Sequence, residues 1–511
     1  MQNKRLRLSF QNIWRCAITI WLTINSIVSF AQQTSSSYLN SPGNKVLEKE
    51  LNEFYQSSDS QSLWFRSGQI PVLLKHIKLC GQIGLGSHIS FPEYDAALTL
   101  KDSLTQDTQL TRTALRLMEA LHCGFRKPAF RYDGLQYTCS LATSGRLLLE
   151  ALQTRSLNEI LEQLSPRGIE YDSLTAMLGR LISISGKPGF SDIFVSKPKT
   201  GTDSLRLMKR LAQFELIEGE PNFSDTAYIR NVIKKAQLLF DLEPDGIVGL
   251  RTINAINIPI AIRIRELEST LDFIRWSREL KKKQSTIFLN IPAAKLKIYQ
   301  NGTNVLESKV IVGKASTPTP MLTGIIDEIV LYPFWMVPYN IATREMLPDI
   351  RRDNGFLERG NYQILNRLGK IVKPANINWY TLSTSYFPYV IRQSTGCDNA
   401  LGTIKFDFDN PFAVYLHDTP GKELFRKKSR FFSHGCMRVE KPVDLAHLLL
   451  KDNRIAIDTL TEKGCLLQQK PIPVSAKIKT GLIVHYNTAW YDYQAGVIFY
   501  SDVYSKFGKE R

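Results

Sequence analysis

The sequence predicts an α+β multidomain protein, in which a helical N-terminal part is followed by a mostly β part. Residues 40–185 carry helical periodicity with few strand signals, whereas short apolar or alternating runs recur from residue 285 onward. The length of 511 residues agrees, because at about 150 residues per domain it predicts roughly three domains. With 43% apolar and 22% charged residues, the composition excludes collagen-like, mostly disordered and multi-span membrane proteins.

The N-terminus predicts export. Basic residues precede an apolar run at 16–30, and Ser29 and Ala31 stand at the −3 and −1 positions of a cleavage site. This pattern is typical of a secretory signal peptide, here residues 1–31, and indicates a periplasmic or cell-envelope location. The run is short for a membrane span of about 20 residues. An uncleaved N-terminal membrane anchor is the alternative.

The helical region is predicted to be a scaffold domain over residues 32–200. Its clearest helix is at 103–124, where apolar residues recur at spacings of three and four: Leu110, Ala114, Leu117, Met118 and Leu121. The region gathers no cluster of titratable groups of the kind that an active site needs. A stretch rich in Gly, Ser, Lys and Pro at 186–203 is predicted to be a linker.

A small helical module is predicted at residues 201–262. An apolar helix face ending near Phe240 is followed by an Asp245-Gly246 turn and a second helix that opens at Thr252. Gln237 and the residues at 245–256 resemble the small three-helix peptidoglycan-binding module of bacterial wall enzymes. A helical hairpin without a ligand is the alternative. Residues 263–284 are predicted to form a linker helix.

Residues 285–475 are predicted to form a mostly β domain. Alternating or apolar runs flank Asn301-Gly302, which is a hairpin signal. The more polar span 340–400 is predicted to be an inserted lobe that caps a site. Residues 476–511 are predicted to be a C-terminal tail.

One cysteine and one histidine carry the chemistry of this β domain. His417 ends an apolar run, and Cys436 follows nineteen residues later, directly after Gly435. A thiol needs a nearby base to act as a nucleophile near neutral pH, and imidazole can supply that base. Gly435 permits a tight turn that would aim the amides of residues 434–436 at a developing oxyanion.

The seven cysteines do not indicate a metal site. They form no CxxC pair, and the chain has no HExxH motif, so no metal and no cofactor is expected. A chain of this length does not need disulfides to fold, and the cysteines are predicted to be mostly free. The surplus of 65 Lys and Arg over 48 Asp and Glu gives a net charge of +17, which favours acidic partners. No nucleic-acid-binding motif is present, and export argues against such a partner.

The active-site segment resembles a known family. Ser433-His434-Gly435-Cys436-Met437-Arg438, preceded by His-Asp-Thr-Pro at 417–420, is similar to the signature of L,D-transpeptidases, the cysteine enzymes that cross-link bacterial peptidoglycan. Residues 319–320, 335–338 and 399–406 resemble the large murein-type members. The order of parts does so too: signal, scaffold, peptidoglycan-binding module, and catalytic domain with a capping lobe. Cys397 departs from the family pattern and has no explanation.

The resemblance implies a mechanism. Cys436 would attack the carbonyl between the third residue, a diamino acid, and the fourth, D-Ala, of a peptidoglycan tetrapeptide stem. D-Ala leaves, and the amine of another stem takes the acyl group to give a 3→3 cross-link. His417 would be the base, oriented by a local backbone carbonyl, and the Gly435 and Cys436 amides would hold the oxyanion. His434 is assigned to the catalytic segment, more as a supporting residue than as the base.

Other family positions are implied to bind the substrate. These are Tyr415, Trp335, Arg438 and Ser433. The implied partners are tetrapeptide stems and glycan strands, and carbapenem β-lactams would acylate Cys436. The acyl acceptor is left open, because water in place of an amine would make the protein an L,D-carboxypeptidase or amidase. A wall-binding scaffold without catalysis is a further alternative.

Overall fold

The computed structural model describes residues 42–58, 63–86, 91–99, 103–196, 201–217, 225–283, 285–396, 398–451 and 470–507. The predicted signal segment at 1–31 and Cys397 lie outside these residues. The chain divides into two compact units, the first made of residues 1–80, 87–122 and 140–165, and the second of 81–86, 123–139 and 166–511. Within the described part, no helix is both long and apolar enough to cross a membrane.

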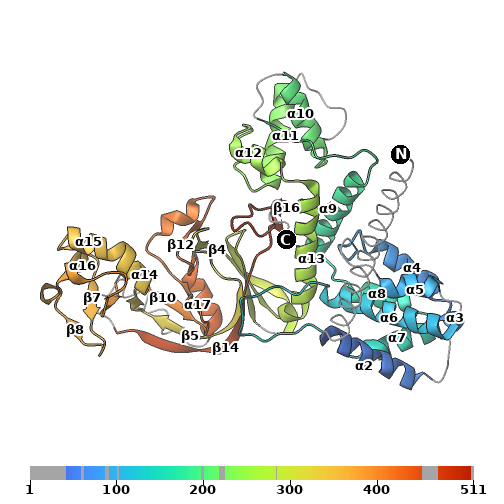
Figure 1. Cartoon of the computed structure of the whole chain (residues 1–511), viewed down its shortest axis with the longest axis horizontal. Coiled ribbons are helices and arrows are strands. Elements are labelled where there is room, and N and C mark those ends of the chain that lie inside the picture. The colour runs from blue at the N-terminus through green and yellow to red at the C-terminus, as the bar shows by residue number, and fades with distance from the viewer. Residues whose placement is uncertain are drawn as a thin grey trace, which may run out of the picture. The chain divides into compact units, whose positions relative to one another are not determined.

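The first unit is helical, as predicted (Figure 1). Its helices are α2 (Pro42–Ser57), α3 (Leu63–Ser67), α4 (Ile70–Leu79), α5 (Pro92–Thr99), α6 (Ser103–Cys123), α7 (Ser144–Gln153) and α8 (Leu157–Leu164). The apolar face predicted for residues 103–124 is buried on α6. Trp64, also buried, donates its indole N–H to Thr111 Oγ1 on α6 at 2.9 Å. This hydrogen bond satisfies the one polar group that Trp64 carries into the core.

The first unit ends earlier than the predicted scaffold boundary at residue 200. Helix α9 (Ile169–Ser185) belongs to the second unit, where Tyr171, Leu174 and Leu178 lie in one apolar core with residues of α13 (Ile260–Lys283). The difference has a physical reason, since an amphipathic pattern shows that a helix has an apolar face but does not show what that face packs against.

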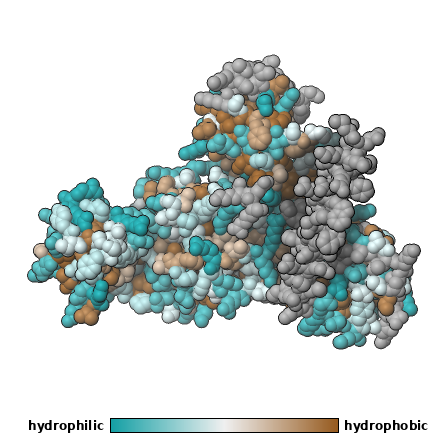
Figure 2. All heavy atoms as spheres, in the orientation of Figure 1, coloured by the Kyte–Doolittle hydropathy of each residue, from teal (hydrophilic) through white to brown (hydrophobic). Residues whose placement is uncertain are grey.

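A helical module follows α9 and consists of α10 (Gly201–Ala212), α11 (Thr226–Leu239) and α12 (Leu250–Ile256). Its central turn is built around the buried Gln237, whose amide donates to Asp245 Oδ1 at 2.7 Å and to the Ile247 carbonyl at 3.0 Å. Gly246 has a φ of +75°, which favours glycine. Three apolar side chains of the module are largely exposed: Leu238, Ile247 and Leu250. Figure 2 shows hydrophobic residues, in brown, at the surface of this module.

The linker helix predicted at residues 263–284 is present, because residues 263–283 lie in α13. It does more than connect two domains, since its apolar residues Leu267 and Leu271 are fully buried. Charged residues of α13 are buried as pairs, with Arg263 Nη1 at 2.8 Å from Glu266 Oε2. The sequence conceals this burial because a paired charge can enter a core although it looks like a surface residue in a hydropathy pattern.

The β part is a sheet that closes on itself. Its strands are β2 (Thr286–Asn290), β3 (Lys295–Gln300), β4 (Thr303–Gly313), β5 (Leu322–Leu331), β10 (Ile404–Asp407), β11 (Leu416–His417), β12 (Phe431–Ser433), β13 (Met437–Val439) and β14 (Ile472–His485). The order β5-β10-β11-β13-β4-β3-β2-β14 closes because β14 also pairs with β5, and β12 pairs with β4. Helix α17 (Pro442–Leu450) contributes Leu445 and Leu449 to the apolar core.

The predicted C-terminal tail at 476–511 is therefore wrong. Strand β14 pairs in parallel with β2 over 481–485 and antiparallel with β5 over 472–484. It is followed by the hairpin β15 (Ala489–Asp492) and β16 (Gly496–Phe499). The first half of β14 is mostly exposed, so its residues do not show the apolar pattern of a core strand.

The inserted lobe has its own small sheet and core. The sheet order is β6 (Trp335–Met336), β9 (Val390–Gln393), β7 (Tyr362–Leu365) and β8 (Ile371–Val372). The accompanying helical segments are α14 (Tyr339–Ile341), η1 (Ala342–Met346), α15 (Leu347–Arg352), α16 (Phe356–Arg359), η2 (Pro374–Asn376) and η3 (Trp379–Thr381). Buried Ile364, Ile391 and Leu347 belong to this core, which is separate from that of the closed sheet.

A disulfide holds a strap against the closed sheet. Cys123 and Cys139 are bonded, with their Cα atoms 5.7 Å apart, so the expectation that the cysteines are mostly free fails for this pair. Between them, β1 (Tyr132–Asp133) pairs in parallel with β5. Spacing alone could not reveal the bond, because cysteine pairing depends on where the fold brings the two residues.

Removing this disulfide should destabilise the second unit. A bond across a separation of 16 residues restricts the unfolded chain, and its loss in a Cys123→Ser/Cys139→Ser variant should cost about 3 kcal/mol of unfolding free energy. Urea unfolding of oxidised wild type and variant measures the difference. Reductant should lower the wild-type midpoint and leave the variant unchanged; equal midpoints for oxidised and reduced wild type would contradict the assignment.

Candidate active site

The site is built on two neighbouring parallel strands, β11 and β13. Leu416 pairs with Met437 and His417 with Arg438. Leu416 and Met437 point into the core and are fully buried. Because side chains alternate along a strand and registered parallel neighbours share a face, His417 and Arg438 lie on the opposite face, together with the preceding alternate positions, 415 and 436. The fold thus brings the predicted nucleophile and base to one face.

The ring of His417 is oriented by the backbone. Its Nδ1 lies 2.5 Å from the carbonyl oxygen of Asp418, which can only accept, so Nδ1 carries the proton. Nε2 is then the unprotonated nitrogen that could take a proton from a thiol. Burial, and next the positive charge of Arg438, lower the pKa of His417 to about 3, so the imidazole is neutral at physiological pH.

Asp418 is fixed by the segment that precedes β10. Its Oδ2 accepts from the backbone N–H of Thr403 at 3.0 Å and from the Thr403 hydroxyl at 3.1 Å, while Oδ1 lies 2.5 Å from Lys422 Nζ. Gly402 has a φ of +61°, and a Cβ there would lie 2.3 Å from the carboxylate. Glycine is therefore required next to the aspartate whose carbonyl orients His417.

The nucleophile follows a turn that is held by two hydroxyls. Gly435 has a φ of +120°, and its carbonyl accepts from Thr319 Oγ1 at 2.8 Å. The hydroxyl of Ser433 donates to the Cys436 carbonyl at 2.6 Å and accepts from the Gly435 N–H at 3.1 Å. These bonds fix the backbone direction at the cysteine.

Two implied roles compete with hydrogen bonds of this turn. Ser433 is 2% exposed, and its hydroxyl is engaged as both donor and acceptor within the turn, which argues against direct substrate binding. The N–H of Gly435 is already donated to that hydroxyl, which argues against its use in an oxyanion hole in this conformation. The resemblance could not show this, because it matches residue types and not hydrogen bonds.

Several groups around the Cys436 sulfur counteract the effect of burial on the pKa of its thiol. Burial raises the pKa of the Cys436 thiol, whereas the backbone and phenol of Tyr415, and the cations Lys405 and Arg438, act to lower the pKa. The result is a raised pKa, so the resting group is a thiol. Of the hydrogen bonds described for Sγ, one is a long 4.0 Å contact with the Ala413 carbonyl.

Tyr415 contacts Cys436, the predicted nucleophile, and several other residues of the site. Lys405 Nζ lies 4.6 Å from the centre of the Tyr415 ring, and the rings of Tyr415 and His417 meet edge to face at 5.7 Å. Burial raises the pKa of the Tyr415 phenol, which also interacts with Cys436 and Trp335. Tyr415 thus lies beside the sulfur, and Trp335 contacts the Tyr415 phenol.

The lobe and the motif meet through His434. Its Nε2 lies 2.9 Å from Glu345 Oε1 of η1, and its side chain is 36% exposed. His434 therefore contacts the lobe and supports the site from its edge. Arg438 is partly buried, and its Nε makes no hydrogen bond within the described residues.

The sequence analysis assigned no individual role to several residues that contribute to the site: Lys405, Asp418, Gly402, Thr319 and Glu345. Lys405 faces the site because it pairs with His417 across β10 and β11. That pairing joins distant segments, and only the alternation of Lys405 and Asp407 around Phe406 hinted that these residues share a face.

Replacing Gly402 should impair catalysis through His417. In Gly402→Ala, the new Cβ would displace the Asp418 carboxylate, and the left-handed backbone would cost about 1–2 kcal/mol of stability. We expect Cys436 to react more slowly with a carbapenem while the fold persists. Gly369→Ala is the matched control, since Gly369 has a φ of +73° with open space around it. Equal rates in both variants would contradict the role of Gly402.

Comparison with known proteins gives two domain matches and one curated relative. Residues 284–457 match the YkuD family, described as the L,D-transpeptidase catalytic domain, and residues 49–178 match the Scaffold domain. A Haemophilus influenzae protein provisionally named an L,D-transpeptidase is 39% identical over 220 residues. The alignment spans 43% of this chain and 44% of that protein, so the chain covers less than half of its relative.

Solved structures give only weak overlaps. The avibactam carbamoyl enzyme of Ldtfm is 12% identical with a TM-score of 0.20, covering 40% of this chain and 49% of that one. An L,D-transpeptidase from Mycobacterium smegmatis is 13% identical with a TM-score of 0.19, covering 40% and 58%. At such scores the likeness carries no argument.

The catalytic match contains Cys436, His417 and strands β2 to β13 of the closed sheet, whereas the closing strand β14 lies beyond it. The Scaffold match contains helices α3 to α8 and most of α2, and it extends into α9 of the second unit. Residues 284–457 are therefore similar to L,D-transpeptidase catalytic domains, and residues 49–178 to Scaffold domains.

Proposed function

We propose that the protein is an L,D-transpeptidase that forms 3→3 cross-links in peptidoglycan through an acyl-enzyme on Cys436. The observation that supports this most is the pairing of β11 with β13, which sets Cys436 and His417 on one face. The Asp418 carbonyl adds support, because it leaves Nε2 of His417 free to act as a base.

In the first step, His417 Nε2 takes the thiol proton as Cys436 attacks the carbonyl between the third and fourth residues of a tetrapeptide stem. The C–S bond forms and the carbonyl becomes an oxyanion, which the Cys436 N–H can approach. The C–N bond then breaks, and the imidazolium returns its proton to the departing D-Ala amine. A thioester of the third residue remains on Cys436.

In the second step, the side-chain amine of another stem attacks the thioester. His417 removes a proton from this amine, the C–S bond breaks, and the sulfur leaves as a thiolate that regains the proton. The product is an amide between two third-position residues. Arg438 is suited to bind a substrate carboxylate, because its buried Nε has no protein partner among the described residues.

The two reacting groups are neutral before substrate binds. The pKa of His417 is lowered to about 3 while that of Cys436 is raised, so a stable thiolate–imidazolium pair is disfavoured. Proton transfer must then accompany attack on the substrate. Such an enzyme keeps a less reactive sulfur at rest, which suits a thiol in an oxidising compartment.

The helical module at 201–262 is proposed to bind the glycan strands. The exposed apolar side chains of Leu238, Ile247 and Leu250 give it a surface that a monomer has no need to expose. The basic surplus of the chain would favour acidic stems. A location in the periplasm or cell envelope is proposed from the signal pattern at 1–31, and the Cys123–Cys139 bond suits an oxidising compartment.

Two alternatives differ in the fate of the acyl-enzyme. Attack by water on the thioester would make the protein an L,D-carboxypeptidase or an amidase. A wall-binding scaffold would form no acyl-enzyme at all. The oriented imidazole and the positioned sulfur favour a catalytic protein over the scaffold.

Cys436→Ala should abolish cross-linking while wall binding by the module persists, since the substitution removes only the nucleophile. Purified tetrapeptide muropeptides, analysed by mass spectrometry, should yield 3→3 dimers and free D-Ala with wild type and neither with the variant. Shortened monomers without dimers would instead indicate the hydrolase. A variant that still forms dimers would show that the nucleophile is misassigned.

The pH dependence of acylation and alkylation should show that His417 and Cys436 are both neutral before substrate binds. Because the His417 pKa is lowered to about 3 from 6.5, the base stays unprotonated as pH falls through 6.5, and the carbapenem acylation rate should show no inflection there. Because burial raises the Cys436 pKa from 9.0, alkylation by iodoacetamide should keep rising with pH beyond 9.0. Stopped-flow acylation and mass-detected alkylation measure these rates, with Cys436→Ala as background. A plateau in alkylation starting near neutral pH would indicate a resting ion pair.

A further inference from the structure

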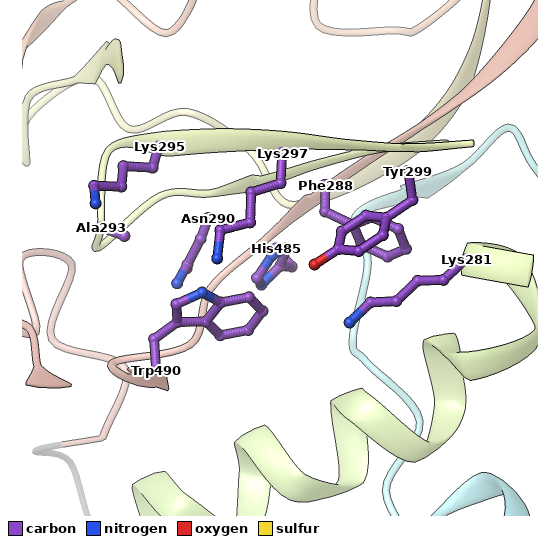
Figure 3. Close-up of a pocket in the computed structure, with 9 residues that line it drawn as sticks. All are labelled: Lys281, Phe288, Asn290, Ala293, Lys295, Lys297, Tyr299, His485 and Trp490. Carbon is purple, nitrogen blue, oxygen red and sulfur yellow. The ribbon is translucent and has the colours of Figure 1, made fainter. Parts of the chain in front are cut away.

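A pocket on the outer face of the closed sheet is separate from the catalytic residues. It is lined by residues of β2, the following turn, β3, the end of β14, β15 and α13 (Figure 3): Lys281, Phe288, Asn290, Ala293, Lys295, Lys297, Tyr299, His485 and Trp490. The empty space at this pocket is about 300 Å³, most of which is open solvent outside the enclosed part. In the strand order, β4 stands between β3 and the catalytic strand β13. The pocket therefore does not belong to the catalytic site.

The charged groups that line this pocket are all cations. Lys281, Lys295 and Lys297 contribute ammonium groups, and no carboxylate is among the lining residues. Lys295 is engaged, with its Nζ 2.7 Å from Asp492 and 3.2 Å from Glu307. The charge of Lys295 is therefore already neutralised by protein carboxylates.

Lys281 and Lys297 are held more loosely. The side chain of Lys297 is 7% exposed, yet its nearest carboxylate, Glu307, is 3.9 Å away, beyond hydrogen-bonding distance. The side chain of Lys281 is 15% exposed and lies 3.4 Å from Glu170. Ammonium groups so far removed from water gain from a further anionic partner.

His485 is the independent sign of a missing partner. It is 1% exposed and stacks on Phe273 with ring centroids 4.1 Å apart. Neither its Nδ1 nor its Nε2 has a hydrogen-bond partner among the described residues. In Figure 3 the imidazole lies beside the Lys297 side chain, and the Tyr299 hydroxyl points toward both. A buried imidazole in which neither nitrogen has a hydrogen-bond partner is unusual in a folded protein.

We propose that this pocket is a binding site for a carboxylate group, held by Lys281, Lys297 and His485. The charge favours an anion, and the limited space favours the tip of a ligand over a whole sugar ring. Two kinds of ligand carry such a group: a small organic acid and the C-terminus of a peptide. A peptide C-terminus would also bring an amide N–H, which the second ring nitrogen of His485 can accept. This inference does not depend on the proposed transpeptidase activity.

Saturation-transfer NMR on the full chain tests the proposal, with acetate and N-acetyl-D-alanine as probes. Both should show contact with wild type, and N-acetyl-D-alanine methyl ester, which lacks the negative charge, should not. Stronger binding of N-acetyl-D-alanine than of acetate would identify a peptide C-terminus, and equal binding a small acid. A methyl ester that binds as well as the acid would overturn the carboxylate assignment.

Variants locate the bound probe. Lys297→Met and Lys281→Met keep the aliphatic stem and should weaken binding about tenfold each, the equivalent of one charge-assisted hydrogen bond. Lys309→Met is the matched control, because Lys309 pairs with Glu440 outside the pocket, and its binding should be unchanged. Binding retained in both pocket variants would overturn the site. Should a variant not fold, a crystal structure of wild type with acetate decides: carboxylate density between Lys297 and His485 supports the site, and a water alone refutes it.

Discussion

The parallel register between β11 and β13 is the constraint on which the active site depends. Burial of Leu416 and Met437 on the inner face fixes this register, because a shift of one residue in either strand would turn that strand's apolar side chain out of the core. The same shift would turn the reactive residue of that strand, His417 or Cys436, into the core. A short apolar contact thus determines where the reactive side chains point, and the turn at Gly435 and the carbonyl of Asp418 refine their directions.

Burial also determines the protonation state of the site. The desolvation that packs His417 against its neighbours keeps the imidazole neutral, and the same desolvation keeps the sulfur protonated. Lys405 and Arg438 act in the opposite direction on the sulfur, which prevents a still larger rise of its pKa. The site therefore combines burial, which raises the Cys436 pKa, with two nearby cations, which act to lower it.

Local patterns in the sequence predicted what depends on neighbouring residues. The periodicity at 103–124 predicted α6, Asn301-Gly302 predicted the β3–β4 turn, and the motif around Cys436 predicted the catalytic match. The features that the sequence did not reveal depend on contacts that the local sequence pattern does not show. The burial of α13 depends on ion pairs such as Arg263–Glu266. The Cys123–Cys139 bond depends on the path of the strap between these two residues. The role of Ser433 depends on hydrogen bonds within its turn.

Strand β14 has a consequence for the order in which the protein matures. The ribosome completes Cys436 and His417 well before it makes residues 472–485, which close the sheet between β2 and β5. A nascent chain with both reactive residues thus still has two unpaired sheet edges, which are sticky until the last strand arrives. Closure of the sheet must therefore wait until residues 472–485 have been made, and a chain that stops before them would keep both edges unpaired.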